Sequence, residues 1–211
     1  MESRTPFALS AADFRARALR AVTAMDGEDF YGDHRLNPTL RHLIVREGLR
    51  DAAVLVPVID RHDGATVLLT KRAEKMRNHS GQVAFPGGRI DPEDASPEAA
   101  ALREADEEVG LKARDIEIIG RLPDYLTGSG YRIAPVLSIV RPGFTLTINP
   151  DEVADAFEVP LGFLMDAANH RQDSRIWQEV ERFFYTMPYG EKHIWGVTAG
   201  IIRALHDRLY A

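Results

Sequence analysis

The most constraining stretch of the chain is residues 84–111, AFPGGRIDPEDASPEAAALREADEEVGL, where a glycine turn leads into a carboxylate-rich segment. Ser96 suits the N-cap of a helix, Pro97 suits its first turn, and Gly110 is placed to end it. The pattern therefore predicts a helix from about Pro97 to Val109. The fold of the chain must therefore accommodate the charged face of this helix.

The predicted helix has one apolar face and one acidic face. Ala105 and Val109 fall on the packing side, whereas Glu104, Glu107 and Glu108 fall within about 100° of one another on the other side. Like charges at these spacings repel, and each pair costs about 0.2–0.5 kcal/mol without a counter-charge. Carboxylates on a rigid helix, facing a turn that offers backbone carbonyls, suit Mg²⁺ or Mn²⁺. Because acidic helix faces are commonly just solvated, the helix alone leaves both interpretations open.

Cysteine is absent from the 211 residues, which excludes disulfides, thiolate nucleophiles and cysteine-held metal centres. A bound metal would therefore need oxygen or imidazole ligands. The net charge of −6 argues against nucleic acid as a partner, because that binding rests on a basic surface. No apolar run approaches the roughly 18 residues of a membrane span, and the amino terminus lacks a signal-peptide pattern. We therefore expect a cytoplasmic protein with no membrane partner.

A basic segment directly precedes the acidic one. Residues 71–89 contain five Lys or Arg and one acid, a local charge of +4, whereas residues 91–108 contain eight acids and one arginine, a local charge of −7. Arginine and lysine suit phosphate oxygens, and clustered carboxylates suit divalent cations. The charge pattern indicates a phosphate ester as substrate.

The rest of the chain alternates between short strands and helices. We predict an N-terminal helical extension over residues 1–50, packed on a domain of residues 51–211. Periodicity and turn signals predict strands at 52–59, 66–70, 116–119, 133–140, 145–148 and 177–185, and helices at 11–25, 160–165 and 194–210. Periodicity alone supports α/β or α+β, and strands on both sides of the central helix favour an α/β/α sandwich with a mixed β-sheet.

Apolar residues at helical spacing identify candidates for the core. In the first predicted helix these are Phe14, Leu19 and Val22. In the last predicted helix Trp195 shares a stripe with Ile202, among others, and we expect it to pack in the core.

Residues 87–111 resemble the signature of the Nudix hydrolases, G-x5-E-x7-R-E-U-x-E-E-x-G-U, in which U is apolar. The segment from Arg103 to Leu111, READEEVGL, has the required spacing and is called the Nudix block below. Two departures lie upstream of it. The pattern has Glu where this chain has Asp94, and one extra residue separates Asp94 from Arg103.

The resemblance implies a Nudix-type fold and a metal cofactor, Mg²⁺ or Mn²⁺. Glu104 and Glu108, with Glu107 and the Gly87 carbonyl, would hold the metal. The base that accepts a proton from the attacking water would be a glutamate of the Nudix block, Glu104 or Glu107, or else Glu152 in the loop before residue 153. The sequence does not decide between them, and an exposed loop glutamate without a role is an equal alternative for Glu152.

Residues 68–88, LLTKRAEKMRNHSGQVAFPGG, look like the additional signature of the coenzyme A pyrophosphatase branch, L-L-T-x-R-[S/A]-x3-R-x3-G-x3-F-P-G-G, and meet every fixed position. The extra residue before Arg103 also resembles that branch. Arg72 and Arg77 are therefore the candidates for substrate binding, because the planar guanidinium suits phosphate oxygens. Either arginine could instead pair with a carboxylate of the Nudix block.

The resemblance thus implies metal-dependent hydrolysis of the pyrophosphate of coenzyme A, giving 4′-phosphopantetheine and adenosine 3′,5′-bisphosphate. One alternative is a Nudix pyrophosphatase that acts on ADP-ribose, dinucleotides or nucleoside triphosphates. Another is a non-catalytic, nucleotide-binding sensor with the same fold, although such a module is expected to lose a glutamate of the Nudix block. A homodimer is neither required nor forbidden by the acidic charge.

Overall fold

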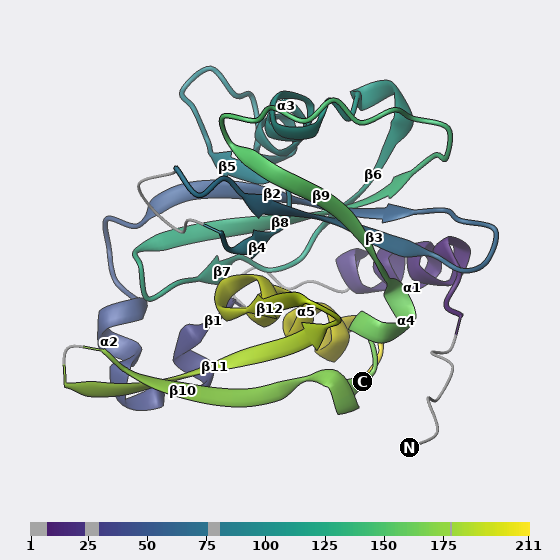
Figure 1. Cartoon of the computed structure of the whole chain (residues 1–211). Helices are drawn as coiled ribbons and strands as arrows, with labels where there is room; N and C mark the ends of the chain where they lie inside the picture. Colours follow the sequence, from purple (N-terminus) through teal and green to yellow (C-terminus); the bar gives the residue numbers. More distant parts are fainter. Residues whose placement is uncertain (1–7, 24–29, 76–80, 178) are drawn as a thin grey trace.

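A mixed β-sheet forms the middle layer of the computed structural model, which describes residues 8–23, 30–75, 81–177 and 179–211 (Figure 1). The two long central strands, β2 (Arg50–Ile59) and β8 (Tyr131–Val140), pair in parallel along their whole length. The other strands of this sheet are β1 (Tyr31–Gly32), β3 (Thr66–Arg72), β4 (Val83–Ala84), β5 (Gly87–Arg89), β6 (Ile116–Arg121), β7 (Tyr125–Leu126) and β9 (Val153–Pro160).

Strand β3 pairs with three other strands. It pairs antiparallel with the end of β2, with β4 and with β9, while β5 pairs antiparallel with the beginning of β2. The mixed sheet that the sequence predicted is therefore confirmed. Its central strands are apolar on both faces because helices cover both sides of the sheet.

Helix α3 (Pro97–Val109) covers one face of the sheet. Its Ala100, Ala101 and Ala105 are fully buried against the sheet, where small side chains let the helix lie close. The Ser96 hydroxyl accepts a hydrogen bond from the Ala99 N–H at 3.2 Å, and Gly110, at φ 72°, ends the helix in the left-handed conformation. The predicted bounds of this helix are confirmed.

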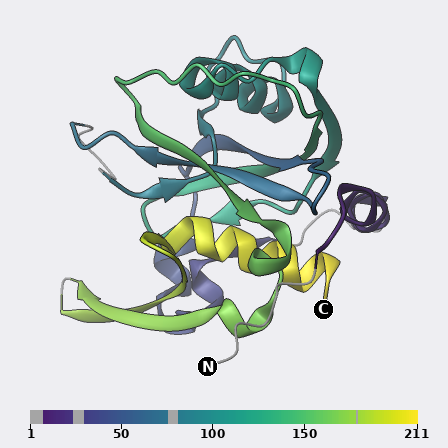
Figure 2. The same ribbon diagram turned by 45° about the vertical axis from the view of Figure 1, so that its right-hand side comes forward.

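Helices α1 (Ala11–Thr23) and α5 (Gly196–Leu209) lie on the other side of the sheet (Figure 2). Phe14 of α1 and Ile202 and Leu205 of α5 are buried in one core with the sheet. The prediction for Leu19 is wrong, because its side chain is 41% exposed. The proposed division of the chain at residue 50 stays a prediction. Among the described helices, none has the length and apolar character needed to cross a bilayer.

A small antiparallel sheet packs below the main one. It consists of β10 (Arg171–Trp177), β11 (Val180–Tyr189) and β12 (Lys192–Trp195). Short helical segments complete the described fold: η1 (Asp33–Arg35), η2 (Pro38–Leu40), α2 (Arg41–Ile44), η3 (Ala113–Asp115), α4 (Leu161–Leu164) and η4 (Ala167–Asn169). Of these, α4 matches the helix predicted at 160–165.

The small sheet corrects two predictions. The strand predicted at 177–185 is confirmed from Val180 onward as part of β11, but its start is wrong because Trp177 ends β10. The helix predicted at 194–210 begins only at Gly196, because Ile194 and Trp195 belong to β12. Trp195 is therefore half-buried at a strand end instead of packed in a helical stripe. Its ring meets the Phe184 ring edge-on, with centroids 5.4 Å apart.

Residues 145–148 form no strand, which corrects a third prediction. Their backbone binds the end of α3 instead. The Thr147 N–H donates to the Val109 carbonyl at 2.9 Å, and the Asn149 N–H donates to the Glu108 carbonyl at 2.9 Å. Carbonyls of the last helical turn have no partner within the helix, so this segment satisfies them. It also leads the chain to Glu152.

Asn37 fixes the hairpin of β10 and β11 to the rest of the protein. It is buried, its amide donates to the Phe183 carbonyl at 2.9 Å, and its carbonyl oxygen accepts from the Phe183 N–H at 2.9 Å. We expect Asn37→Ala to lower the free energy of unfolding by about 2–3 kcal/mol, because two backbone groups lose their partners. Urea unfolding measures this change. The matched control is Gln172→Ala at an exposed position of β10, and equal losses in both variants would contradict the prediction.

Candidate active site

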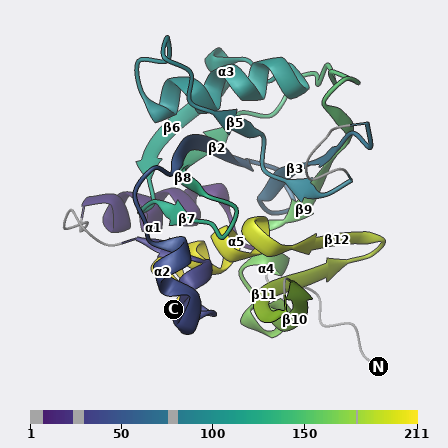
Figure 3. The same ribbon diagram turned by 90° about the vertical axis from the view of Figure 1, so that its left-hand side faces the viewer.

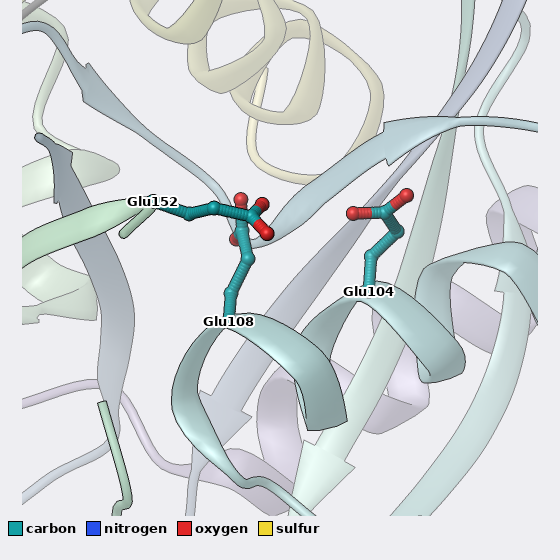
Figure 4. Close-up of side chains that lie close together, drawn as sticks. All are labelled: Glu104, Glu108 and Glu152. Carbon is teal, nitrogen blue, oxygen red and sulfur yellow. The ribbon is translucent and has the colours of Figure 1, made fainter. Parts of the chain in front are cut away.

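Three carboxylates converge between α3 and the loop that precedes β9. Glu104 and Glu108 lie one turn apart on α3, and Glu152 reaches toward them from the loop (Figure 4). One oxygen from each of the three lies within 4.8 Å of the others. These residues are called the carboxylate trio below. The arrangement brings three hard oxygen donors to one point, as Mg²⁺ or Mn²⁺ coordination requires.

Glu108 is the most deeply buried member of the carboxylate trio. It is 2% exposed, and its Oε2 accepts a hydrogen bond from the Gly87 N–H at 3.2 Å. Burial raises the pKa of Glu108 to about 8, and the charges of Glu104 and Glu152 act in the same direction. The Gly87 N–H and the nearby guanidinium of Arg72 lower it in part. Buried like charges are unfavourable without a counter-ion, so the donor set fits a divalent cation.

The glycine turn leaves space for these carboxylates. A Cβ at Gly88 would lie 2.5 Å from the carboxylate carbon of Glu104. A Cβ at Gly87, whose φ is 154°, would lie 2.4 Å from the backbone oxygen of Ala53 in β2. Any side chain here would push either the carboxylate or the strand away. The two glycines therefore permit the close approach of α3, β5 and β2.

Arg103 holds the acidic groups around the site in position. Its Nη1 donates to Glu104 at 3.0 Å and to Glu107 at 2.9 Å, while its Nε and Nη2 donate to the two oxygens of Asp94 at 3.1 and 2.9 Å. Hydrogen bonding to Arg103 lowers the pKa of Asp94. Asp94, at the position where the Nudix pattern has Glu, thus orients Arg103, and Arg103 orients Glu104.

The structure separates Glu107 from the carboxylate trio. Its side chain is 55% exposed and is paired with Arg103. The roles proposed for Glu107 in catalysis and metal binding stay predictions. Gly87 contacts the cluster through its N–H, which binds Glu108, and the proposed role of its carbonyl also stays a prediction.

Of the two predicted substrate-binding arginines, the structure describes Arg72 but not Arg77. Arg72, at the end of β3, lies with its Nη1 3.7 Å from Oε1 of Glu108, so one of its contacts is the carboxylate pairing that the sequence left open. Within the described residues, its buried Nε has no hydrogen-bond partner. Arg72 thus has donor capacity left beside the carboxylate trio. Arg77 lies outside the described residues.

Sequence reasoning missed the orienting role of Arg103 and Asp94. In the sequence pattern Arg103 only opens the Nudix block, whereas in the structure its side chain reaches back across the loop to Asp94. The position of Asp94 in the Nudix pattern could have indicated this contact. An acid at that position can reach the arginine at the start of the Nudix block.

The raised pKa of Glu108 predicts how the stability of the metal-free protein changes with pH. A carboxyl whose folded-state pKa is raised stabilises the fold below its ordinary value of 4.5, and this contribution is lost as the pH rises through about 8. We expect the free energy of unfolding, measured in urea with a chelator, to fall between about pH 5 and 8 more steeply than in Glu108→Gln. Added Mg²⁺ should stabilise the wild type more at the upper end of this range. Equal slopes for both proteins would contradict the prediction.

Comparison with known proteins agrees with this geometry. Residues 49–183 match the NUDIX domain, and the chain belongs to the Nudix hydrolase family. It is 44% identical over 162 residues to the uncharacterized Nudix hydrolase NudL of Photorhabdus laumondii, covering 76% of this chain and 85% of that protein. It is 40% identical over 160 residues to NudL of Yersinia pestis, covering 76% of this chain and 80% of that protein.

Among solved structures, the NUDIX domain of Shewanella oneidensis NrtR, determined with ADP ribose, resembles the chain with a TM-score of 0.50. The identity is 18%, and the match covers 78% of this chain and 90% of that one, so the likeness concerns the fold alone. The predicted fold class is confirmed. As a Nudix hydrolase, the protein is a pyrophosphohydrolase with a small, nucleotide-type substrate.

Proposed function

We propose that the enzyme hydrolyses the pyrophosphate bond of coenzyme A or its derivatives, giving 4′-phosphopantetheine and adenosine 3′,5′-bisphosphate. The observation that supports this most is the match of residues 68–88 to the coenzyme A pyrophosphatase signature. Arg72, a fixed residue of that signature, lies beside the carboxylate trio with its Nε unpartnered among the described residues. A guanidinium in this place suits a phosphate bound next to the metal.

In this proposal the carboxylate trio holds Mg²⁺ or Mn²⁺. A divalent ion bound there would lower the pKa of a bound water and neutralise charge on the phosphates. Arg103 keeps Glu104 aimed at the site, and the Gly87 N–H fixes one oxygen of Glu108. Arg72 orients the diphosphate through its remaining donors.

Hydrolysis adds a water oxygen to one phosphorus and breaks the bond from that phosphorus to the bridging oxygen. The water proton passes to a carboxylate, for which the candidates are Glu104 and Glu152, the two less buried members of the carboxylate trio. Glu152 is half-buried, and its Oε1 accepts from the Asn149 amide at 3.3 Å, so its loop position is constrained. Glu107 would need to leave Arg103 to take this role.

The test is product analysis by chromatography after incubating the purified protein with coenzyme A, ADP-ribose or NADH and Mg²⁺ or Mn²⁺. We expect chelator-sensitive release of adenosine 3′,5′-bisphosphate from coenzyme A, faster than cleavage of the other two. Faster cleavage of ADP-ribose or NADH would keep the hydrolase chemistry and overturn the substrate assignment. No turnover of any substrate would favour the sensor alternative.

A further inference from the structure

A cavity of about 550 Å³ lies away from the carboxylate trio, none of whose residues line it. Its walls come from η2 and α2, the turn after β7, the hairpin of β10 and β11, and the start of α5, which lie on one side of the molecule (Figure 3). The volume is within the range of small-molecule sites. Asn37 holds the hairpin against η2, so the walls are joined to each other by hydrogen bonds.

The cavity has an excess of positive charge. Arg175 and Arg182 lie directly opposite each other across β10 and β11, so their side chains share the face that lines the cavity, which Arg46 also lines. Like charges in directly opposed positions destabilise a hairpin. In the part of the chain that the structure describes, none of these three arginines forms an ion pair within 4.0 Å, and the buried Nε of Arg182 has no hydrogen-bond partner. A bound anion would relieve this repulsion.

Asp33 is the acidic residue among the described residues that line the cavity, and its single charge offsets only part of the charge of the three arginines, through its interaction with Arg182. Its carboxylate already accepts hydrogen bonds from the Tyr125 hydroxyl at 2.8 Å and the Gly128 N–H at 2.7 Å. Burial raises the pKa of Asp33, and these hydrogen bonds and the charge of Arg182 lower it in part. These hydrogen bonds hold the turn after β7 in place.

Aromatic rings and a helix start complete the cavity. Trp177 is 50% exposed and Trp195 is half-buried, and both line it together with Phe184. The first turn of α5, at Gly196 and Val197, also faces it, and no side chain caps this helix. Uncapped N–H groups at a helix start favour negative charge. The combination suits an anionic group attached to a flat ring.

We propose that this cavity binds a phosphorylated nucleoside, with the phosphate held by Arg175, Arg182 and Arg46 and the base against the tryptophan rings. If the proposed function is correct, the ligand is the adenosine 3′-phosphate end of coenzyme A. Only this identification of the ligand rests on the proposed function. The start of α5 lies between this cavity and the strand that leads to the glycine turn, because the Thr198 hydroxyl donates to the Val83 carbonyl at 2.9 Å. Under the proposed function, one substrate would contact both sites across this helix start.

The chain contains two tryptophans, and both line the cavity, so intrinsic tryptophan fluorescence reports on its occupation. The full-length protein is titrated with adenosine 3′,5′-bisphosphate, with adenosine and with inorganic phosphate, in the presence of a chelator. We expect a saturable change with the bisphosphate that weakens as the salt concentration rises, and weaker binding of adenosine and of phosphate. Arg175→Gln, at an exposed position, should raise the Kd roughly tenfold.

The matched control is Arg171→Gln, which lies exposed on the same strand outside the cavity lining and should leave the Kd unchanged. No saturable change, or equal Kd values for the two variants, would overturn the proposal. The hydrolysis assay separates the two hypotheses. If coenzyme A is hydrolysed with the same KM by Arg175→Gln and the wild type, the proposed function stands and the identification of the cavity ligand as the adenosine 3′-phosphate end of coenzyme A fails. If the bisphosphate binds in an Arg175-dependent way and coenzyme A is not hydrolysed, the nucleoside phosphate site stands and the substrate assignment fails.

Discussion

Glu108→Gln is expected to lower kcat/KM for the hydrolysed substrate by roughly two to three orders of magnitude, the usual cost of losing one key electrostatic group. The amide keeps the size of the side chain but removes the charge that would hold the metal. The loss should not come from unfolding, because a carboxyl whose pKa burial raises to about 8 is itself unfavourable in the metal-free fold at neutral pH. Steady-state kinetics at saturating Mg²⁺, with a melting curve of each protein, measure both quantities.

The control for this experiment is Asp106→Asn on the same helix. Asp106 pairs with Lys112 at the protein surface and is not part of the carboxylate trio. Its substitution should leave kcat/KM within a small factor of the wild type. Near-normal turnover by Glu108→Gln at saturating metal would show that the trio does not carry the reaction.

Gly87→Ala is expected to lower the free energy of unfolding by about 2–4 kcal/mol, because strain at a positive φ adds to a backbone clash. At φ 154°, the new methyl group would lie 2.4 Å from the Ala53 carbonyl oxygen and 2.7 Å from the Val54 Cα. Neither atom belongs to a side chain that can turn away. Any shift of β5 also moves the N–H that binds Glu108, so activity should fall with stability.

Gly48→Ala separates the effect of strain at a positive φ from the effect of the backbone clash. Gly48 also has a positive φ, 72°, but a Cβ there would meet nothing within 4 Å. It should cost only about 1–2 kcal/mol from the left-handed conformation, with activity unchanged. If urea unfolding gave the same loss for both variants, the clash with β2 would not be the reason that position 87 needs glycine.

The central helix could be predicted because its determinants are local. Ser96, Pro97 and Gly110 set its ends, and the positions of Glu104 and Glu108 one turn apart set a shared face. The periodicity also placed Glu107 near that face, but an angular range cannot show which carboxylates an arginine will take. Arg103 binds Glu107 and keeps it at the surface.

Other features depend on contacts between distant segments. Glu152 was one loop glutamate among alternatives until the fold placed it against α3. Residues 145–148 have strand-like composition, but the N–H groups of Thr147 and of the following Asn149 bind the end of α3. The predicted strand at 177–185 did not include Arg175, and the opposition of Arg175 and Arg182 follows from the register of the hairpin. These contacts follow from tertiary packing, which single-sequence patterns do not encode.

We propose that Glu104, Glu108 and Glu152 form one divalent-metal site. The most direct measurement is the loss of the free Mn²⁺ electron paramagnetic resonance signal as protein is added, for wild type, Glu108→Gln, Glu152→Gln and Asp106→Asn. We expect the wild type and Asp106→Asn to bind Mn²⁺ alike, and each glutamate variant to bind it at least roughly tenfold more weakly. Wild-type affinity in both Glu108→Gln and Glu152→Gln would contradict the account.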